Sequence, residues 1–125
     1  MNPEPHPVMA DTQGGSCHCG AVRYQIEGSP EDVMECNCSH CQRKGYLLWF
    51  VPRDALKFES GEDALSTYTF NRHVIQHKFC PTCGCAPFGF GKGKDGEETV
   101  AVNVRCLEDV DLDAIKRKPV DGRSF

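Results

Sequence analysis

Apolar side chains recur at every second position in several short segments of this chain. In AVRYQIE, residues 21–27, Val22, Tyr24 and Ile26 point to one side of an extended backbone. The charged and polar residues between them point to the other side. This period of two is typical of a strand with one buried face. Short strands are predicted in the same way for KFESGE, LSTYTF and HVIQHKF, at residues 57–62, 65–70 and 73–79.

Other segments predict the remaining elements. The continuous apolar run YLLWFV, residues 46–51, suits a strand that is covered on both faces. A glycine-rich turn with Asp95-Gly96 separates two β-type segments and predicts a hairpin. The stretch DLDAIKRK, residues 111–118, favours one or two helical turns. The predicted fold is therefore all-β, mainly antiparallel, with at most one or two short helical turns.

The length of 125 residues fits one domain. Residues 1–14 are rich in proline, glycine and polar groups, and they predict a disordered N-terminal arm. Residues 15–125 contain no repeat and no linker that would divide them. They are therefore expected to form one domain.

Nine cysteines are the unusual feature of the composition. The N-terminal stretch has no basic n-region followed by an apolar run, so no signal peptide is expected. The longest apolar run is too short to span a bilayer. We therefore expect a cytoplasmic protein without a membrane partner. In the cytoplasm thiols stay reduced, so cysteine clusters indicate metal binding or catalysis rather than disulfides.

Two cysteine pairs predict a closed metal site. In CPTCG, Cys80 and Cys83 have the C-x-x-C spacing that places two sulfurs on one side of a tight turn, as tetrahedral zinc requires. In CHCG, Cys17 and Cys19 have a spacing that also allows both sulfurs to face one metal. Together the pairs make a four-thiolate structural site. The alternatives are a redox C-x-x-C pair, or buried cysteines that act as small apolar side chains.

A third group, CNCSHC, contains Cys36, Cys38 and Cys41. Three thiolates leave one coordination position of zinc free, as catalytic zinc sites do for water or substrate. The main alternative is a second closed site, in which another histidine or cysteine of the chain supplies the fourth ligand. An iron–sulfur cluster or a metal-free reactive thiol is less well supported by the spacing. The candidates for a fourth ligand are His40, Cys85 and Cys106.

The formal net charge of -4 argues against a nucleic-acid partner, because phosphate binding requires clustered positive charge. A local basic pocket remains compatible with this charge. The oligomeric state is not predictable from the sequence.

The segments GSCHCGAVRY, CNCSHCQRKG and FCPTCG together resemble the glutathione-dependent formaldehyde-activating enzyme (GFA, or centromere-protein-V-like) family. The resemblance extends from about Gly15 to about Asp111. It implies a β-tent fold, in which two antiparallel sheets are bridged by zinc. It also implies two zinc ions, a structural one and an open catalytic one. The implied ligands are Cys17, Cys19, Cys80 and Cys83 for the first, and Cys36, Cys38 and Cys41 for the second.

The resemblance further implies a carbon–sulfur lyase activity with glutathione as co-substrate. The family activity is the addition of glutathione to formaldehyde, which gives S-hydroxymethylglutathione. The partner would thus be a small-molecule thiol adduct. Glutathione has two carboxylates, so a substrate pocket should offer positive charge. The candidates for substrate binding are Arg43, Lys44 and Arg72, with His73 and Lys78 close by in the sequence.

Two other functions are compatible with the pattern. A non-catalytic zinc-binding interaction module would have the second site closed by a fourth protein ligand. An enzyme similar to methionine sulfoxide reductases would need a reactive thiol away from zinc, for which Cys106 is the candidate.

Overall fold

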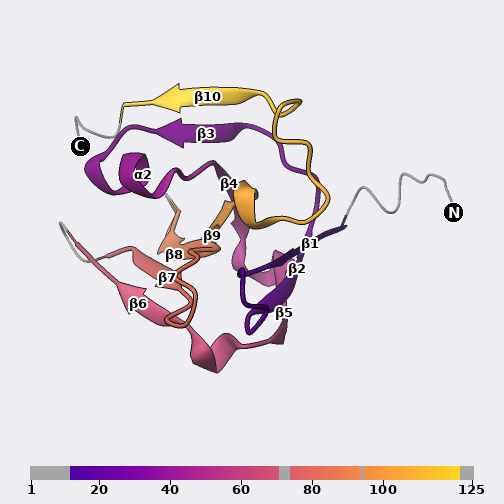
Figure 1. Cartoon of the computed structure of the whole chain (residues 1–125). Helices are drawn as coiled ribbons and strands as arrows, with labels where there is room; N and C mark the ends of the chain where they lie inside the picture. Colours follow the sequence, from indigo (N-terminus) through magenta and orange to yellow (C-terminus); the bar gives the residue numbers. More distant parts are fainter. Residues whose placement is uncertain (1–11, 71–73, 94, 122–125) are drawn as a thin grey trace, which may run out of the picture.

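A computed structural model describes residues 12–70, 74–93 and 95–121, in which strands are far more frequent than helical segments (Figure 1). The predicted all-β, mainly antiparallel fold is confirmed. A three-stranded sheet has the order β1-β2-β5, and a seven-stranded sheet has the order β10-β3-β4-β9-β8-β7-β6. Among the described strands, only β10 and β3 pair in parallel. The strands are β1 Thr12–Ser16, β2 Arg23–Glu27, β3 Val33–Cys36, β4 Leu48–Pro52, β5 Leu56–Ser60, β6 Ser66–Tyr68, β7 Gln76–Phe79, β8 Phe88–Lys92, β9 Glu98–Asn103 and β10 Arg117–Val120.

The helical segments are short. Within residues 12–70, 74–93 and 95–121, the α-helix is α2, Ser39–Lys44, between β3 and β4, and there are also three 3-10 turns. These are η1 Arg53–Ala55, η2 Glu62–Ala64 and η3 Val104–Cys106. None of the helices in the described part of the chain has the length and apolar character of a membrane span.

The first strand begins earlier than the sequence pattern predicted. β1 pairs antiparallel with β2 from Thr12, opposite Glu27, to Ser16, opposite Arg23. The predicted boundary of a disordered arm at residue 14 is therefore wrong for residues 12–14, and residues 1–11 lie outside the described residues. The segment TQGGS has no apolar side chain. Its strand conformation therefore depends on main-chain pairing with β2. A pattern of hydrophobic residues cannot predict such pairing.

The apolar run at 46–51 differs from the prediction of a strand covered on both faces. In β4, Trp49 and Val51 are buried in the core, whereas Phe50 between them is 47% exposed. One face of β4 packs against the interior, and the other carries Phe50 and Leu48 toward a cavity described below. The hydrophobicity of the second face is therefore not explained by core packing.

The C-terminal segment also differs from its prediction. The expected helical turns at 111–118 are wrong: residues 112–114 form only a turn, and Arg117–Val120 form β10 beside β3. Pairing with an available strand edge outweighs a weak local helix signal in so short a segment. In the described residues an α-helix forms instead at Ser39–Lys44, which includes Cys41 of the three-cysteine segment.

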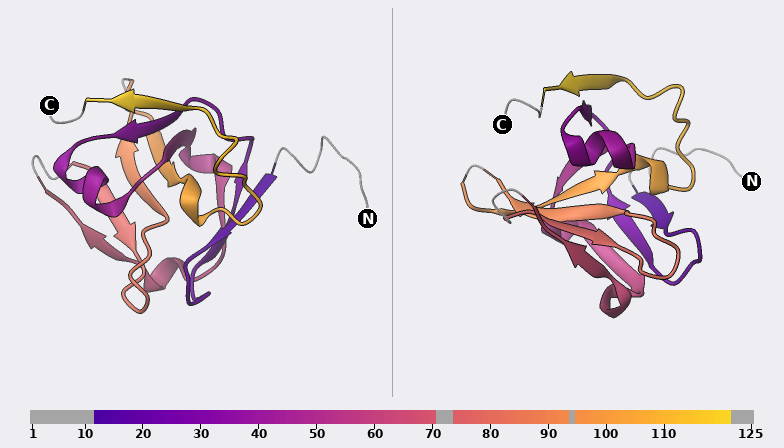
Figure 2. Two further views of the ribbon diagram at one scale, coloured as in Figure 1. Left: turned by 45° about the horizontal axis from the view of Figure 1, so that its top comes forward. Right: turned by 60° about the vertical axis from the view of Figure 1, so that its left-hand side comes forward.

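The two sheets share one core. Phe88 of β8 contacts aromatic rings of the other sheet, with ring centroids 5.0 Å from Tyr24 of β2 and 5.6 Å from Phe58 of β5. These edge-to-face contacts join the three-stranded sheet to the middle of the seven-stranded one. Figure 2 shows β3, β10 and α2 on one side of the molecule, with β6, β7 and β8 across from them. This arrangement places the two predicted metal sites in different parts of the fold.

Candidate metal centres

Four cysteine thiols meet where the two sheets are joined by turns. Cys17 and Cys19 lie between β1 and β2, and Cys80 and Cys83 lie between β7 and β8. Their sulfur atoms are all within 4.8 Å of one another, and the Sγ of Cys19 is 3.6 Å from both Cys17 and Cys80. The fold thus brings together two cysteine motifs that are some sixty residues apart in the sequence.

The turn after Cys80 has the form that the sequence predicted. Gly84 adopts a φ of 84°, and its N–H donates to the carbonyl oxygen of Cys80 at 2.7 Å. A residue with a side chain would be strained at this φ, so glycine allows the chain to reverse directly after Cys83. Because the pair lies between strands β7 and β8, it lacks the helix N-terminus that activates redox C-x-x-C cysteines. This local structure favours metal binding over redox chemistry.

The four thiols fit a tetrahedral zinc ion. A Zn–S bond of about 2.3 Å places tetrahedral sulfurs roughly 3.8 Å apart, close to the observed 3.6 Å. Backbone N–H groups stabilise negative charge on these sulfurs. Val22 donates to the Sγ of Cys17 at 3.4 Å, and the N–H groups of Cys85 and Cys19 lower the pKa of Cys83 to about 5. Metal ligands require the thiolate form, so this environment suits a metal.

The second group comprises Cys36, Cys38 and Cys41, whose sulfur atoms also lie within 4.8 Å of one another. Cys36 ends β3, Cys38 caps the N-terminus of α2, and Cys41 is buried in the first turn of that helix. The helix ends at Gly45. The strand end and the helix turn thus bring the three sulfurs together within six residues of sequence.

Hydrogen bonds also prepare this group for the thiolate form. The N–H of Cys41 donates to the Sγ of Cys38 at 3.3 Å, and the N–H of Cys38 donates to the Sγ of Cys36 at 3.5 Å. Burial opposes ionisation of Cys38, but the N–H groups of Cys41 and His40 and the adjacent thiols outweigh it and lower its pKa. Burial and the neighbouring sulfurs raise the pKa of Cys41. A metal ion would relieve this repulsion between sulfurs, so the three-thiol group fits a divalent cation.

No fourth ligand joins this group from the described residues. Among the described cysteine, histidine and carboxylate side chains, none brings a fourth ligand atom within 4.8 Å of all three of these sulfurs. Cys85 and Cys106 pack instead against the core cluster or the carbonyl of Ala86. Within the described chain, the three-thiol group therefore has the composition of an open site.

Cys106 does not have the properties of an activated nucleophile. Burial, followed by the charges of neighbouring cysteines, raises its pKa to about 12. Its Sγ is 3.8 Å from the Nδ2 of Asn103 and 3.9 Å from the carbonyl oxygen of Ala86. Cys106 is thus a partly buried thiol that resists ionisation. This disfavours an activity like that of methionine sulfoxide reductases, which requires a reactive thiol.

A cavity of about 550 Å³ lies beside α2 and is lined in part by basic side chains. Two of the predicted substrate-binding residues, Arg43 and Lys44, line it together with Lys78 of β7. In the part of the chain that the structure describes, none of these three cations forms an ion pair with a carboxylate. The other predicted residue, Arg72, lies outside the described residues, as does His73. This cavity is therefore suited to an anionic ligand.

A second cavity, of about 740 Å³, contains the three-thiol group itself. Its walls are mainly apolar and come from β3, β4, β7, β8, β9, β10 and the segment that precedes β7. It shares Tyr46 and His77 with the basic cavity, so the two are adjacent. The apolar side chains that line it are Met34, Leu48, Phe50, Phe70, Val74, Ile75, Phe88, Ala101 and Val120.

His40 and His77 form an aromatic cluster at the junction of the cavities. Their ring centroids are 4.4 Å apart, and His40 also contacts Tyr46, Tyr68 and Phe70 at 5.1–5.4 Å. Burial lowers the pKa of both histidines, followed by Lys44 for His40 and by His40 for His77, whose pKa falls to about 4. Both are therefore neutral near pH 7. His40 is therefore a half-buried residue of α2 that packs among aromatic rings.

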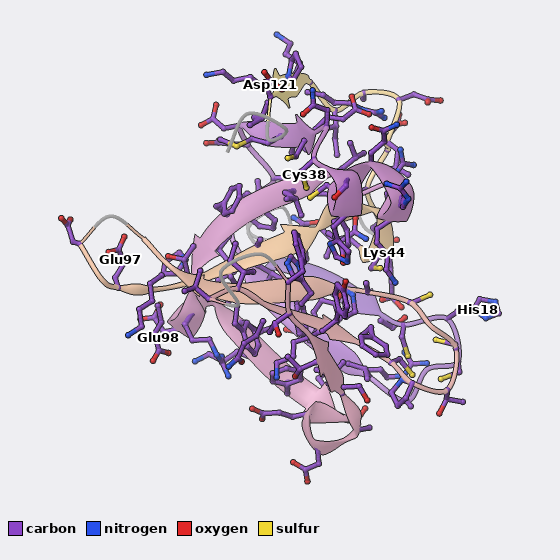
Figure 3. The ribbon with its side chains drawn as sticks, turned by 90° about the vertical axis from the view of Figure 1, so that its left-hand side faces the viewer. His18, Cys38, Lys44, Glu97, Glu98 and Asp121 are labelled. Carbon is purple, nitrogen blue, oxygen red and sulfur yellow. The ribbon has the colours of Figure 1, made fainter. Side chains whose placement is uncertain are left out.

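Several of these residues could not be assigned a site role from the sequence. Tyr46 and Phe50 belong to an apolar run that predicted a core strand, and His77 lies in a segment that predicted only a half-buried strand. The only sequence feature that could have linked His77 to an apolar surface is its spacing of two from Ile75, which places both side chains on the same face of a strand. Figure 3 shows Cys38 and His18 in separate regions with sulfur atoms near each, and His18 points away from the protein.

Comparison with known proteins decides the family. Residues 12–120 match the family described as glutathione-dependent formaldehyde-activating enzyme (GFA). The chain belongs to this family. A solved structure of a protein from Rhodobacter sphaeroides has a TM-score of 0.72 and 30% sequence identity, and the match covers 84% of this chain and 99% of that chain.

The family assignment covers the segments that carry both cysteine groups. GFA membership and the two thiol clusters are compatible with zinc binding and with a glutathione-dependent activity toward formaldehyde or a related compound.

Proposed function

We propose that this chain is a zinc-dependent enzyme that forms and cleaves the carbon–sulfur bond of a glutathione–aldehyde adduct. S-hydroxymethylglutathione, the adduct of formaldehyde, is its simplest substrate. The observation that carries the proposal is the three-thiol group, which has no fourth ligand among the described residues and opens into a cavity next to a cluster of cations. Family membership supports the same class of reaction.

The proposed reaction joins a thiol to a carbonyl carbon. The sulfur of glutathione forms a bond to the aldehyde carbon, and the electron pair of the C=O π bond moves to the oxygen. That oxygen takes a proton, and the proton of the thiol is released to solvent. The lyase direction reverses these steps, with the C–S bond broken and the carbonyl restored. The balance requires no oxidant and no reductant.

Each part of the site has a separate task in this proposal. Cys36, Cys38 and Cys41 hold the zinc ion. Zinc bound there supplies a positive charge and one coordination position, which favour the ionised form of a thiol. The cations of the adjacent cavity meet the carboxylates of glutathione, and the walls of both cavities hold the two reactants close together.

Three sulfur ligands also restrict the chemistry that the site favours. Three thiolates outweigh the two positive charges of zinc, so the ion is a weak acidifier of bound water. Exchange of a soft thiol at the free position suits such a donor set better than water activation does. The three-thiol group therefore suits a reaction of a thiol substrate better than it suits hydrolysis.

Cobalt substitution tests whether the three-thiol group accepts glutathione. We expect the absorption of the cobalt-loaded protein to change on titration with glutathione, because a fourth sulfur would alter the coordination of the second ion. The Cys38→Ser variant should retain the spectrum of the four-thiolate site and show no glutathione-dependent change. A spectrum of the wild-type protein that is unchanged at saturating glutathione would count against the proposed function.

Removal of the cations should weaken glutathione binding without removing the metal. We expect an Arg43→Gln/Lys44→Gln variant to raise KM for glutathione by roughly tenfold, because an exposed ion pair contributes about 0.2–1 kcal/mol and two are lost. Zinc content should stay at the wild-type value. Lys57→Gln is the control, because Lys57 is an exposed cation in β5 of the other sheet. Equal KM values for the double variant and the control would contradict this assignment.

A further inference from the structure

Exposed apolar side chains gather at the three-thiol cavity. In the described residues, four large hydrophobic side chains are exposed: Phe50 at 47%, Tyr68 at 49%, Val74 at 72% and Ile75 at 47%. Phe50, Val74 and Ile75 line the apolar cavity, and Tyr68 lines the adjacent basic one. The exposed apolar surface is therefore concentrated at one site rather than scattered singly over the protein, and such a concentration indicates binding.

The cavity is far larger than formaldehyde requires. Its volume is about 740 Å³, whereas a small molecule such as water occupies only roughly 30 Å³ in the liquid. Formaldehyde has one carbon and no apolar substituent, so it leaves walls such as Phe50 and Ile75 without a partner. Cavities with few polar groups and many apolar ones are typical of sites for ligands with apolar parts.

The two adjacent cavities have complementary character. The basic cavity offers Arg43, Lys44 and Lys78, and the apolar cavity offers the three thiols at its base. Tyr46 and His77 belong to both, so one ligand can extend from one cavity into the other. A glutathione adduct has the matching pattern, with carboxylates at its ends and a sulfur in its middle.

We propose that the substrate class of this enzyme is the adduct of glutathione with an aldehyde that carries an extended alkyl or aromatic substituent. The proposal rests on the proposed function and specifies its substrate. The peptide part lies toward Arg43, Lys44 and Lys78, the sulfur lies at the three-thiol group, and the substituent lies against Phe50, Val74 and Ile75. The bonds that form and break are those given above, and only the group on the carbonyl carbon changes.

Binding of two stable thioethers tests the apolar subsite independently of turnover. S-hexylglutathione and S-methylglutathione carry the same peptide and differ by five methylene groups. We expect calorimetric titration of the zinc-loaded protein to give a Kd at least about tenfold lower for the hexyl compound, because buried methylene groups favour binding. In a rate assay, kcat/KM should likewise be higher for hexanal than for formaldehyde with glutathione.

Variants of the cavity wall locate the effect. Phe50→Asn and Ile75→Asn should each remove most of the preference for the hexyl compound, because a polar side chain then replaces the apolar wall that the alkyl group contacts. Both side chains are exposed, so these changes should preserve folding. Ile115→Asn is the matched control, because Ile115 is a partly buried isoleucine that packs on the main core and lines neither cavity. It should leave both Kd values unchanged.

The possible results separate this inference from the function on which it rests. Equal Kd values for the two thioethers, together with catalysed addition of glutathione to formaldehyde, would overturn the substrate class but retain the enzyme. Absence of binding by either compound and absence of catalysis would overturn both. If the wild-type protein is a dimer that Ile75→Asn converts to a monomer, with no preference for the hexyl compound, the apolar face is an interface between copies, and the inference is wrong.

Discussion

Replacement of Cys80 by serine is expected to abolish cooperative folding, or to lower Tm by on the order of 15 °C or more. Cys80 is fully buried, and its sulfur lies 3.6 Å from that of Cys19 across the junction of the two sheets. Structural zinc contributes about 10–16 kcal/mol of binding free energy in small zinc domains, whereas a whole domain is stable by only about 5–15 kcal/mol. Loss of one ligand should therefore lower the free energy of unfolding by at least about 4 kcal/mol, which corresponds to the stated fall in Tm.

The effect follows from the position of the four-thiol group. Cys17 and Cys19 belong to the turn between β1 and β2, whereas Cys80 and Cys83 belong to the turn between β7 and β8. A metal ion bound by all four connects the two sheets across some sixty residues. Without it, nothing would tie the two turns together through the sulfurs, and repulsion between ionised sulfurs would oppose their close approach. A chelator strong enough to remove this metal should have the same effect as Cys80→Ser.

Thermal melts followed by circular dichroism, with zinc content measured on the same samples, test this expectation. Cys85→Ser is the matched control, because Cys85 is a partly buried cysteine two residues after Cys83 that belongs to neither thiol group. It should retain the wild-type zinc content and a Tm within a few degrees. An unchanged Tm and zinc content for Cys80→Ser would refute the structural role of the four-thiol group.

Cys38→Ser is expected to lower the catalysed rate of adduct formation by at least about 100-fold while the protein stays folded. Groups that merely orient a metal ligand contribute about 10–100-fold to activity, so loss of the ligand itself should cost no less. Serine is well suited to this test. The Sγ of Cys38 caps α2 by accepting from the N–H of Cys41, and a serine hydroxyl caps helices equally well.

The assay should follow S-hydroxymethylglutathione formation by NMR exchange, with the spontaneous reaction subtracted. Cys38→Ser should lose one of two zinc ions and keep its Tm within a few degrees. Two controls accompany it. Ser39→Ala changes the next residue without removing a thiol, and His40→Ala tests whether this histidine supplies a ligand; both should keep two zinc ions. A Cys38→Ser variant as active as the wild type would show that the three-thiol group is not catalytic.

The cysteine groups were predictable because their geometry is local. A C-x-x-C turn with a following glycine places Cys80 and Cys83 together whatever the rest of the fold does, and the segment from Cys36 to Cys41 behaves similarly. Strands such as β2 were predictable because alternate burial of Tyr24 and Ile26 appears directly as a period of two. These features depend on neighbours in the sequence.

The cavities were not predictable because their walls come from distant strands. Phe50 of β4 and Ile75, which directly precedes β7, are twenty-five residues apart and line one cavity because the sheet order is β4-β9-β8-β7. From the sequence, Phe50 was indistinguishable from a core residue such as Trp49. The six-residue helix α2 was missed because it is too short to show helical periodicity. Likewise, β10 exists because β3 offers an edge to pair with.

The most direct measurement of the two-site arrangement is a crystal structure of the protein grown with zinc and soaked with glutathione, with anomalous data collected at the zinc edge. We predict two zinc ions per chain, one bound by Cys17, Cys19, Cys80 and Cys83. The second should be bound by Cys36, Cys38 and Cys41, with the sulfur of glutathione as its fourth ligand. A single zinc ion, or a second ion closed by a side chain such as His40, would contradict the open catalytic site.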